Sequence, residues 1–353
     1  MLDIPKRLFE ALEQKPITNR VRNNQQMYPS SASVRLKNGD IQGACARQTY
    51  YRWFAASRDG QMDPETQLVC DYGDALHDML TGLMSRTSRL SNLDILSVEQ
   101  GFYNPSIFGA GRTDGVLYDN NTNLIHGLEI KTVGDYKSTV TIDSPAVEHI
   151  LQSAQYLHEY NENAKKCGTQ EIQDWSILYL ARSENYKLKK YPHRSPFKYL
   201  WQFTVEIDKT DQHVIVTTQA GNVIHYREIT ISGIYDRFKE NLKSIKEKKI
   251  PDREFEYQYS EEKLTAMSKL TYAQGGLSKP DTAKVDKWIA AGAPEGELGL
   301  SKGDFSCRYC DYSKTCYSDA SDVFDVENTA LINIKKPETT EEDTDSHQTH
   351  DIF

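Results

Sequence analysis

Two acidic residues and a lysine have the types and spacing needed to hydrolyse a phosphodiester bond. Asp114 lies in GRTDGVL, and Glu129 and Lys131 lie in GLEIKTV, so the pattern is D-x14-E-x-K. Carboxylate oxygens suit Mg²⁺ and Mn²⁺, and the backbone carbonyl of Ile130 can complete the shell. A metal lowers the pKa of its bound water, which Lys131 can orient or deprotonate, and Lys131 can also stabilise the transition state. The same spacing also arises in a solvated aspartate and a surface Glu–Lys pair.

Strands must bring these residues together. Three strand-like segments separated by Asn, Pro or Gly turns precede or contain them: 93–103, 109–119 and 124–133. Residues i and i+2 of a strand share one face, so Glu129 and Lys131 should point the same way, with Asp114 beside them on the neighbouring strand. The apolar residues around them predict packed strands, where an uncompensated charge is costly.

Further elements alternate along the chain. Helices are predicted over 44–58, 68–86, 145–162 and 231–249, with apolar residues at mixed i, i+3 and i+4 spacings in 68–86. Strands are expected over 176–181 and 200–207, with a β-ribbon over 213–229. This order predicts an α/β fold in which a mixed sheet is flanked by helices.

Clustered cysteines form a second group. FSCRYCDYSKTCYS gives the spacing C-x2-C-x5-C, and one upstream cysteine is the best fourth ligand, so the set is Cys45, Cys307, Cys310 and Cys316. In a reducing compartment such clusters bind metal more often than they form disulfides. Cys70 and Cys167 have no such spacing and are expected to be buried or free thiols.

The first group resembles the PD-(D/E)XK nuclease superfamily, with Thr113-Asp114 in place of Pro-Asp. His77 in GDALHDML, and Gln152 and Tyr156 in LQSAQYLHEY, are similar to the histidine and the Q-x-x-x-Y motif of its RecB-like branch. The resemblance implies a restriction-endonuclease-like sheet. It implies metal ligation by His77, Asp114, Glu129 and Ile130, and a catalytic set of Lys131, Asp114, Glu129, Gln152 and Tyr156.

One cysteine upstream of these motifs and three downstream resemble the iron–sulfur RecB-like nucleases, which include the CRISPR-associated exonuclease family and AddB-type domains. There four thiolates hold a 4Fe–4S cluster, so the resemblance implies an iron–sulfur subdomain formed by the N- and C-terminal parts. The spacing alone also fits zinc. The implied activity is Mg²⁺- or Mn²⁺-dependent DNA cleavage, by an exonuclease on single-stranded or frayed ends, in recombination, repair or viral DNA processing. The alternative is a non-catalytic iron–sulfur DNA-binding or recombination scaffold.

A basic, aromatic stretch over 182–201 has the composition of a single-strand binding surface, because cations follow phosphates and aromatic rings stack on unpaired bases. Its candidate contacts are Arg182, Lys187, Lys189, Lys190, Tyr191, Arg194, Lys198 and Trp201. A solvated loop with a partly buried aromatic edge has the same composition. Arg47 and Arg112 are further candidates for phosphate contacts.

The net charge of −9 does not exclude a nucleic-acid partner. Residues 317–353 hold ten acids and two bases, so the remaining 316 residues, with 40 bases and 41 acids, are almost neutral. From about residue 336 the like charge and low hydrophobicity predict a disordered tail. Its end, Asp351-Ile352-Phe353, resembles the tails of single-stranded DNA-binding proteins, which recruit partner proteins or compete with DNA; a merely solubilising tail is the alternative.

These features divide the chain into five parts. They are an arm with the first cluster-ligand helix (1–60), a nuclease core (61–257), a helical insertion (258–303), a cluster segment (304–318) and an acidic tail (319–353). No apolar run approaches the roughly 18 residues of a membrane span, and the first residues contain no uncharged h-region. We therefore expect no membrane partner and no secretory signal, and the cytoplasm of a bacterial or virus-infected host cell as the location.

Overall fold

The structure is a computed structural model of the chain. It describes residues 23–59, 64–134, 137–138, 141–182, 199–260, 287, 298–301, 303–318 and 329–332. The chain separates into two compact units. Unit 1 comprises Met1–Ala56 and Gly60–Asp252, and unit 2 comprises Ser57–Asp59 and Arg253–Phe353.

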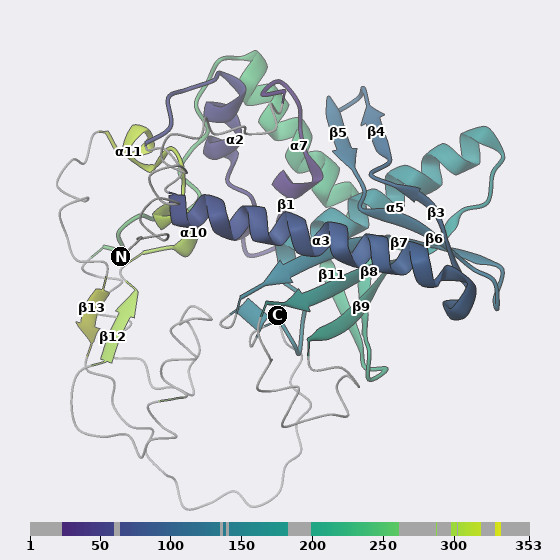
Figure 1. The fold of residues 1–353 in the computed structure, drawn as a ribbon. Helices are drawn as coiled ribbons and strands as arrows, with labels where there is room; N and C mark the ends of the chain where they lie inside the picture. The colour runs from purple at the N-terminus through teal and green to yellow at the C-terminus, as the bar shows by residue number, and fades with distance from the viewer. Residues whose placement is uncertain are drawn as a thin grey trace, which may run out of the picture. The chain divides into compact units, whose positions relative to one another are not determined.

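A seven-stranded sheet with the order β11-β10-β9-β8-β7-β6-β3 forms the centre of unit 1 (Figure 1). Its strands are β3 (Leu93–Val98), β6 (Gly115–Asp119), β7 (Leu124–Val133), β8 (Ile172–Ala181), β9 (Leu200–Ile207), β10 (His213–Thr218) and β11 (Val223–Thr230). β7 and β8 are parallel, and the other neighbouring pairs are antiparallel. Parallel neighbours need a crossover, which α5 (Val147–Cys167) supplies. The predicted mixed sheet flanked by helices is confirmed.

Helices cover both faces of this sheet. α3 (Pro64–Ser91) crosses one face (Figure 1), where Leu80 packs in a small apolar cluster with Leu117, Leu128 and Ile130. α5 lies against the other face and contributes to the main core, together with α7 (Ile231–Lys246). The largest fully buried side chains of that core include Trp175, Tyr179, Phe203 and Phe238. The strand carrying Glu129 is therefore held between two packed layers.

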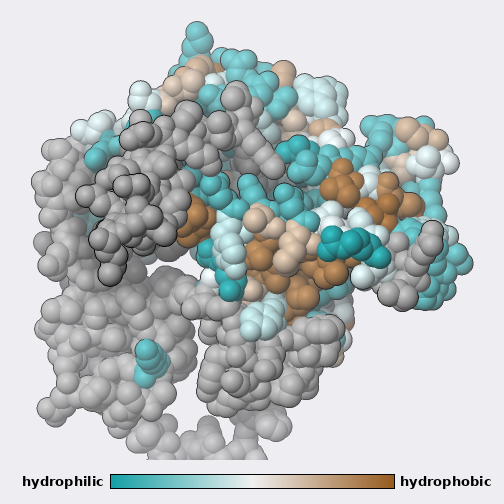
Figure 2. Space-filling model, in the orientation of Figure 1, coloured by the Kyte–Doolittle hydropathy of each residue, from teal (hydrophilic) through white to brown (hydrophobic). Residues whose placement is uncertain are grey.

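α3 carries apolar residues on more than its inner side. The brown areas of Figure 2 show apolar side chains at the surface of the face that α3 crosses. Among the described side chains of this helix, the exposed large apolar residues are Leu68, Val69, Tyr72, Met79 and Leu83. This distribution explains why the apolar spacing in the sequence is mixed, since a helix with a single buried stripe would show one regular repeat.

The stretch before residue 45 differs from its sequence prediction. Polar composition predicts an arm or loose cap over residues 1–44, but within 23–44 Met27, Ala32 and Val34 are buried members of the main core. The elements here are the 3-10 helix η1 (Pro29–Ser31), β1 (Ser33–Arg35) and β2 (Ile41–Gly43), followed by α2 (Ala46–Trp53). Three apolar residues are enough to anchor this stretch to the core, because helices and strands from later in the chain enclose each of them.

The structure explains why glycine is needed at two positions, 168 and 127. Gly168 follows the last residue of α5 with a left-handed φ of 66°, a conformation that glycine adopts without steric cost and that commonly ends helices. Gly127 on β7 pairs with Trp175 on β8, and a Cβ there would lie 2.0 Å from the indole ring. The absence of a side chain at Gly127 therefore makes room for the largest buried residue of the core.

Unit 2 is built from short elements. They are α10 (Phe305–Arg308), α11 (Ser313–Cys316), and the antiparallel pair β12 (Leu298–Ser301) and β13 (Thr329–Ile332). β13 lies within the predicted acidic tail (319–353), before residue 336, from which disorder is predicted. The rest of 319–353, and most of the predicted helical insertion, lie outside the described residues. Among the described helices, none combines the length and apolar character needed to cross a membrane.

Candidate active site

Glu129 and Lys131 lie side by side on the face of β7 that is turned toward α5, as their spacing predicts. Leu128 and Ile130 alternate with them and pack on the α3 side. Lys131 Nζ donates to Glu129 Oε1 at 2.5 Å and to Gln152 Oε1 at 3.0 Å. The strand alternation thus buries the apolar residues on one face and presents the ion pair on the other.

Asp114 reaches the same place from a different element than expected. The sequence predicts one strand over 109–119, but β5 (Gly109–Arg112) ends before Asp114 and β6 begins after it. β5 pairs with β4 (Gly101–Asn104) in a hairpin separate from the main sheet. Asp114 Oδ2 accepts a 2.6 Å hydrogen bond from the Ile130 backbone N–H. The break between two sheets therefore turns the carboxylate toward β7.

The α5 helix fixes the lysine side of the site. Gln152 Nε2 donates to Glu129 Oε1 at 2.8 Å and to the Tyr156 hydroxyl at 3.2 Å. Tyr156 in turn donates to the Arg112 carbonyl at 2.9 Å. Gln152 and Tyr156 are four residues apart and so share one helical face. The predicted Gln–Tyr pair is thus brought against Glu129 and Lys131, and Tyr156 also holds the end of β5 just before Asp114.

His77 from α3 completes the group. Its Nε2 lies 3.4 Å from Asp114 Oδ1 but forms no well-aligned hydrogen bond within the described residues. Proximity to the Asp114 carboxylate raises the pKa of His77, against the opposing effect of partial burial. The predicted residues His77, Asp114, Glu129, Lys131, Gln152 and Tyr156 therefore gather in one place, although they come from four separate parts of the chain.

Glu129 has the most unusual environment of the group. The residue is 2% exposed, and burial raises the pKa of its carboxyl to about 7, with Lys131 opposing the shift and Asp114 adding to it. Its Oε1 accepts from Lys131 and Gln152, whereas its buried Oε2 has no hydrogen-bond partner within the described residues. A buried carboxylate oxygen without a partner is costly unless a cation or donor occupies the space beside it.

A cleft of about 850 Å³ opens beside these residues. Successive turns of α3 line it with Cys70, Gly73, Asp74 and His77, and the opposite side includes the sheet residues of the site. Two arginines also line it: Arg112, which forms a 3.0 Å ion pair with Glu99, and Arg182 at the end of β8. The lining of the cleft thus combines carboxylates, an imidazole and cations.

The donor set fits a hard divalent cation. Two carboxylates and an imidazole face one cleft, Ile130 lines it, and Glu129 Oε2 is a ready acceptor. The ligand atoms of His77, Asp114 and Glu129 do not all lie within 4.8 Å of one another, so side-chain rotation would be needed to place all three on one ion. In the described part of the chain, Asp208, Asp211 and His213 form the one group that meets this spacing. Sequence reasoning missed that group, although its D-x2-D-x-H spacing was a visible signal.

The cysteines divide between the two units. Cys45 precedes the first residue of α2 in unit 1, whereas Cys307, Cys310 and Cys316 lie in unit 2. Burial raises the pKa of the Tyr317 hydroxyl, and the nearby Cys307 and Cys316 add to the shift. Burial raises the pKa of Cys310 to about 11, with nearby Cys316 adding to the shift. Cys70 and Cys167 are exposed thiols, which excludes the buried alternative.

In unit 2, the side chain of Asp59 holds the turn between Cys310 and Cys316. Asp59 Oδ2 accepts from the Ser313 hydroxyl at 2.8 Å and from the Lys314 backbone N–H at 2.7 Å. The Asp59 N–H donates to the Asp311 carbonyl at 2.7 Å. A three-residue piece from far upstream thus closes the turn between Cys310 and Cys316.

The basic stretch is only partly described. Arg182 lines the cleft, whereas Lys187, Lys189, Lys190, Tyr191, Arg194 and Lys198 lie outside the described residues. The prediction that Trp201 contacts DNA is wrong, because Trp201 is 2% exposed, stacks on Tyr179 and donates to the Thr141 carbonyl at 3.0 Å. Its place on β9 turns it into the core.

No protein-family model matches this chain, and no curated protein matches it.

Proposed function

We propose that this protein is a metal-dependent DNA nuclease of restriction-endonuclease-like fold, an exonuclease acting on single-stranded or frayed DNA ends. The observation that carries the proposal is the buried Glu129 Oε2, which has no partner among the described residues and lies in one group with Asp114, His77 and Lys131 beside an open cleft. A structural ion pair would have no need of a third and fourth polar group or of an opening to solvent.

His77, Asp114 and Glu129 would hold Mg²⁺ or Mn²⁺, with the Ile130 carbonyl as a further ligand. When bound, the ion supplies a water of lowered pKa and neutralises charge on the phosphate. Lys131 lies 2.5 Å from Glu129 Oε1, where it can orient the attacking water and stabilise the charge that develops on the phosphate. Gln152 fixes Lys131 and Glu129 together, and Tyr156 fixes Gln152.

The walls of the cleft suit a nucleic-acid backbone. Arg182 has no charged partner within the described residues, and Arg112 can exchange Glu99 for a phosphate. Cations that contact phosphates supply affinity without sequence preference. The cleft therefore supports binding of DNA by its backbone.

The four cysteines Cys45, Cys307, Cys310 and Cys316 would hold a 4Fe–4S cluster, with zinc as the alternative metal. A 4Fe–4S cluster binds each thiolate at a different iron, so its sulfurs lie further apart than those around a single zinc ion. Anaerobically purified protein should carry iron and inorganic sulfide and absorb broadly in the visible range. Colourless protein with stoichiometric zinc would favour the alternative.

The activity is tested with labelled single-stranded DNA and Mg²⁺ or Mn²⁺. Glu129→Gln and Lys131→Met should each lower the rate of cleavage by at least about a hundredfold, the usual effect of losing a charge-stabilising group. Glu162→Gln and Lys165→Met are matched controls, because this Glu–Lys pair lies exposed on α5 away from the cleft. Equal cleavage by both active-site variants and the controls would overturn the assignment, and metal-independent binding without turnover would favour the scaffold.

The acidic tail would act on DNA binding or recruit a partner protein. Residues 336–353 hold six acids and one base, so the tail can compete with DNA for cationic sites. Removal of 336–353 should tighten DNA binding at low salt, and the gain should vanish at high salt because screening weakens the competition.

A further inference from the structure

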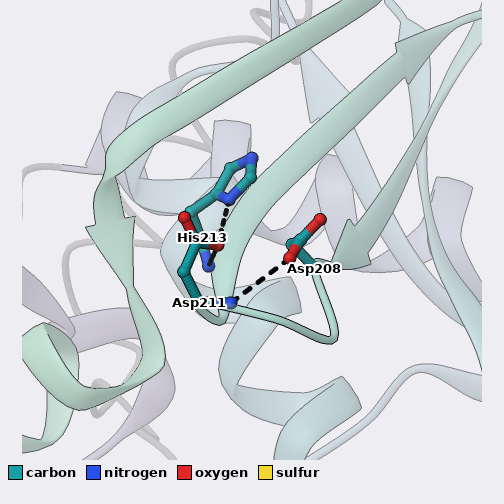
Figure 3. Close-up of side chains that lie close together, drawn as sticks. All are labelled: Asp208, Asp211 and His213. Carbon is teal, nitrogen blue, oxygen red and sulfur yellow. Dashed lines mark hydrogen bonds and ion pairs between the residues drawn. The ribbon is translucent and has the colours of Figure 1, made fainter.

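A second group of metal-binding side chains lies away from the cleft, at the tip of the β9–β10 hairpin. Asp208 follows the last residue of β9, Asp211 lies in the turn, and His213 begins β10 (Figure 3). One ligand atom from each of the three lies within 4.8 Å of the others. This is the spacing that ligands of a single ion require.

The strand register places this hairpin at the opposite end of the sheet from the cleft. β9 begins beside the carboxyl end of β8, where Leu200 pairs with Leu180, and it runs antiparallel to β8 until Val205 pairs with Trp175. The turn after β9 therefore lies near the amino end of β8, whereas Arg182 follows its carboxyl end. A metal here would be independent of the one proposed at Glu129.

The hairpin backbone fixes one oxygen of each carboxylate. Asp208 Oδ1 accepts from the Thr210 N–H at 2.7 Å and the Asp211 N–H at 3.3 Å. Asp211 Oδ1 accepts from the His213 N–H at 3.3 Å and contacts His213 Nδ1. Both carboxylates are thus oriented before any ion arrives.

His213 provides the observation that distinguishes this group from a cluster of surface acids. Its side chain is only 4% exposed, and its two ring nitrogens face different partners: Nδ1 faces Asp211, and Nε2 lies 2.8 Å from His225 Nδ1. A histidine that binds a metal through one nitrogen donates the other ring N–H to a supporting acceptor. His225 is placed to be that acceptor if Nδ1 binds the ion.

A β-bulge aims His213 into this position. His213 pairs with Thr230 whereas the next residue, Val214, pairs with Tyr226, so the register shifts sharply between them. Bulges commonly redirect a side chain at functional positions. The irregularity places the imidazole between the turn carboxylates and β11, on which His225 lies.

We propose that Asp208, Asp211 and His213 bind one divalent transition-metal ion of the zinc class, with His225 as the hydrogen-bond acceptor that supports His213. Two carboxylates and an imidazole match the small tetrahedral ligand set of zinc-class ions, whereas Ca²⁺ takes six to eight oxygen ligands. Three protein ligands leave the fourth position of a tetrahedral ion to water. The bound ion would join the ends of β9 and β10 and, through His225, β11.

The test counts zinc ions. Metal-free full-length protein is titrated with Zn²⁺ by equilibrium dialysis and calorimetry, and compared with the double variant Asp208→Asn/Asp211→Asn. The asparagine side chains keep the oxygens that accept the turn N–H groups, so the hairpin should still form. The wild type should bind one more Zn²⁺ per chain than the double variant, whatever the cysteines bind. Asp236→Asn, an exposed acid on α7, is the matched control and should bind as many ions as the wild type.

Two histidine variants distinguish the metal ligand, His213, from the residue that supports it by a hydrogen bond, His225. His213→Gln should lose the ion, and His225→Gln should retain it with roughly ten- to a hundredfold weaker affinity, the usual effect of losing a supporting hydrogen bond. Equal stoichiometry and affinity in the wild type and the double asparagine variant would overturn the proposal. Unchanged affinity in His225→Gln would overturn the role of His225. Cleavage of DNA is not the readout, so the result is independent of the proposed nuclease activity.

Discussion

Replacing Glu129 by glutamine should stabilise the metal-free protein at alkaline pH, even though the same change should greatly slow the proposed cleavage of DNA. The carboxyl group is buried, and burial raises its pKa from 4.5 to about 7. The native state therefore binds a proton more tightly than the unfolded state. Stability from this group is fully present below about pH 4.5 and is lost as the pH rises through about 7.

The magnitude follows from the size of the shift. Moving from 4.5 to about 7 is roughly 2.5 pKa units, and each unit corresponds to about 1.4 kcal/mol, so ionised Glu129 costs about 3 kcal/mol of unfolding free energy above pH 8. Glutamine cannot ionise and keeps an amide oxygen that can accept from Lys131 and Gln152. The variant and the wild type should therefore have similar stability near pH 4.5 and diverge by about 3 kcal/mol at pH 8.

Urea unfolding in the presence of a chelator measures this difference. Tryptophan fluorescence is a suitable signal, because Trp175 and Trp201 are buried in the core of unit 1. Titrating groups away from Glu129 contribute equally to both proteins and cancel in the difference. Glu162→Gln, on the exposed surface of α5, should run parallel to the wild type. Parallel curves for the wild type and Glu129→Gln would refute the argument that burial leaves this carboxylate poorly compensated.

Three further predictions concern other parts of the molecule. Gln155 is fully buried and neither polar atom of its amide has a hydrogen-bond partner in the described structure, so Gln155→Met should raise the unfolding free energy by about 1–3 kcal/mol, measured by urea melts; a loss of stability would show that the amide is satisfied. Trp201→Phe should lower the unfolding free energy by about 1–3 kcal/mol, because the Thr141 carbonyl loses its donor. The DNA affinity of the folded variant should stay unchanged, and weaker DNA binding would show that Trp201 does contact DNA. Asp59→Ala should release the turn before α11 and speed the loss of the metal proposed at the cysteines to a chelator, whereas Asp59→Asn, which keeps an acceptor, should lose that metal more slowly. Equal rates for wild type and Asp59→Ala would contradict the role of this residue.

The strands of the candidate site were largely predictable because their patterns are local. β7 and β9 have the predicted bounds, and the i, i+2 rule correctly places Glu129 and Lys131 on one face. Gln152 and Tyr156 could be paired for the same reason, since helical spacing alone puts them together. Periodicity predicts well which residues of one helix or strand share a face.

Relations between distant elements were harder to foresee. Asp114 lies at a break between β5 and β6, because the first of these strands pairs with β4 and the second with β7. Trp201, Met27, Ala32 and Val34 have polar neighbours in sequence, but other segments of the chain cover them. Aromatic and cationic composition cannot distinguish a binding surface from a core edge, since the deciding contacts are made by residues far away in sequence.

The contact between Gly127 and Trp175 fixes the register in which β7, the strand of Glu129 and Lys131, pairs with β8. A slip of one residue along β7 would exchange its two faces, placing Leu128 and Ile130 toward α5 and turning Glu129 and Lys131 toward α3. Such a slip would also put a residue with a side chain opposite Trp175, where even a Cβ would lie 2.0 Å from the ring. Gly127, which has no side chain and lies two positions before Glu129, thus excludes the wrong pairing and keeps both charged groups on the cleft side each time the chain folds.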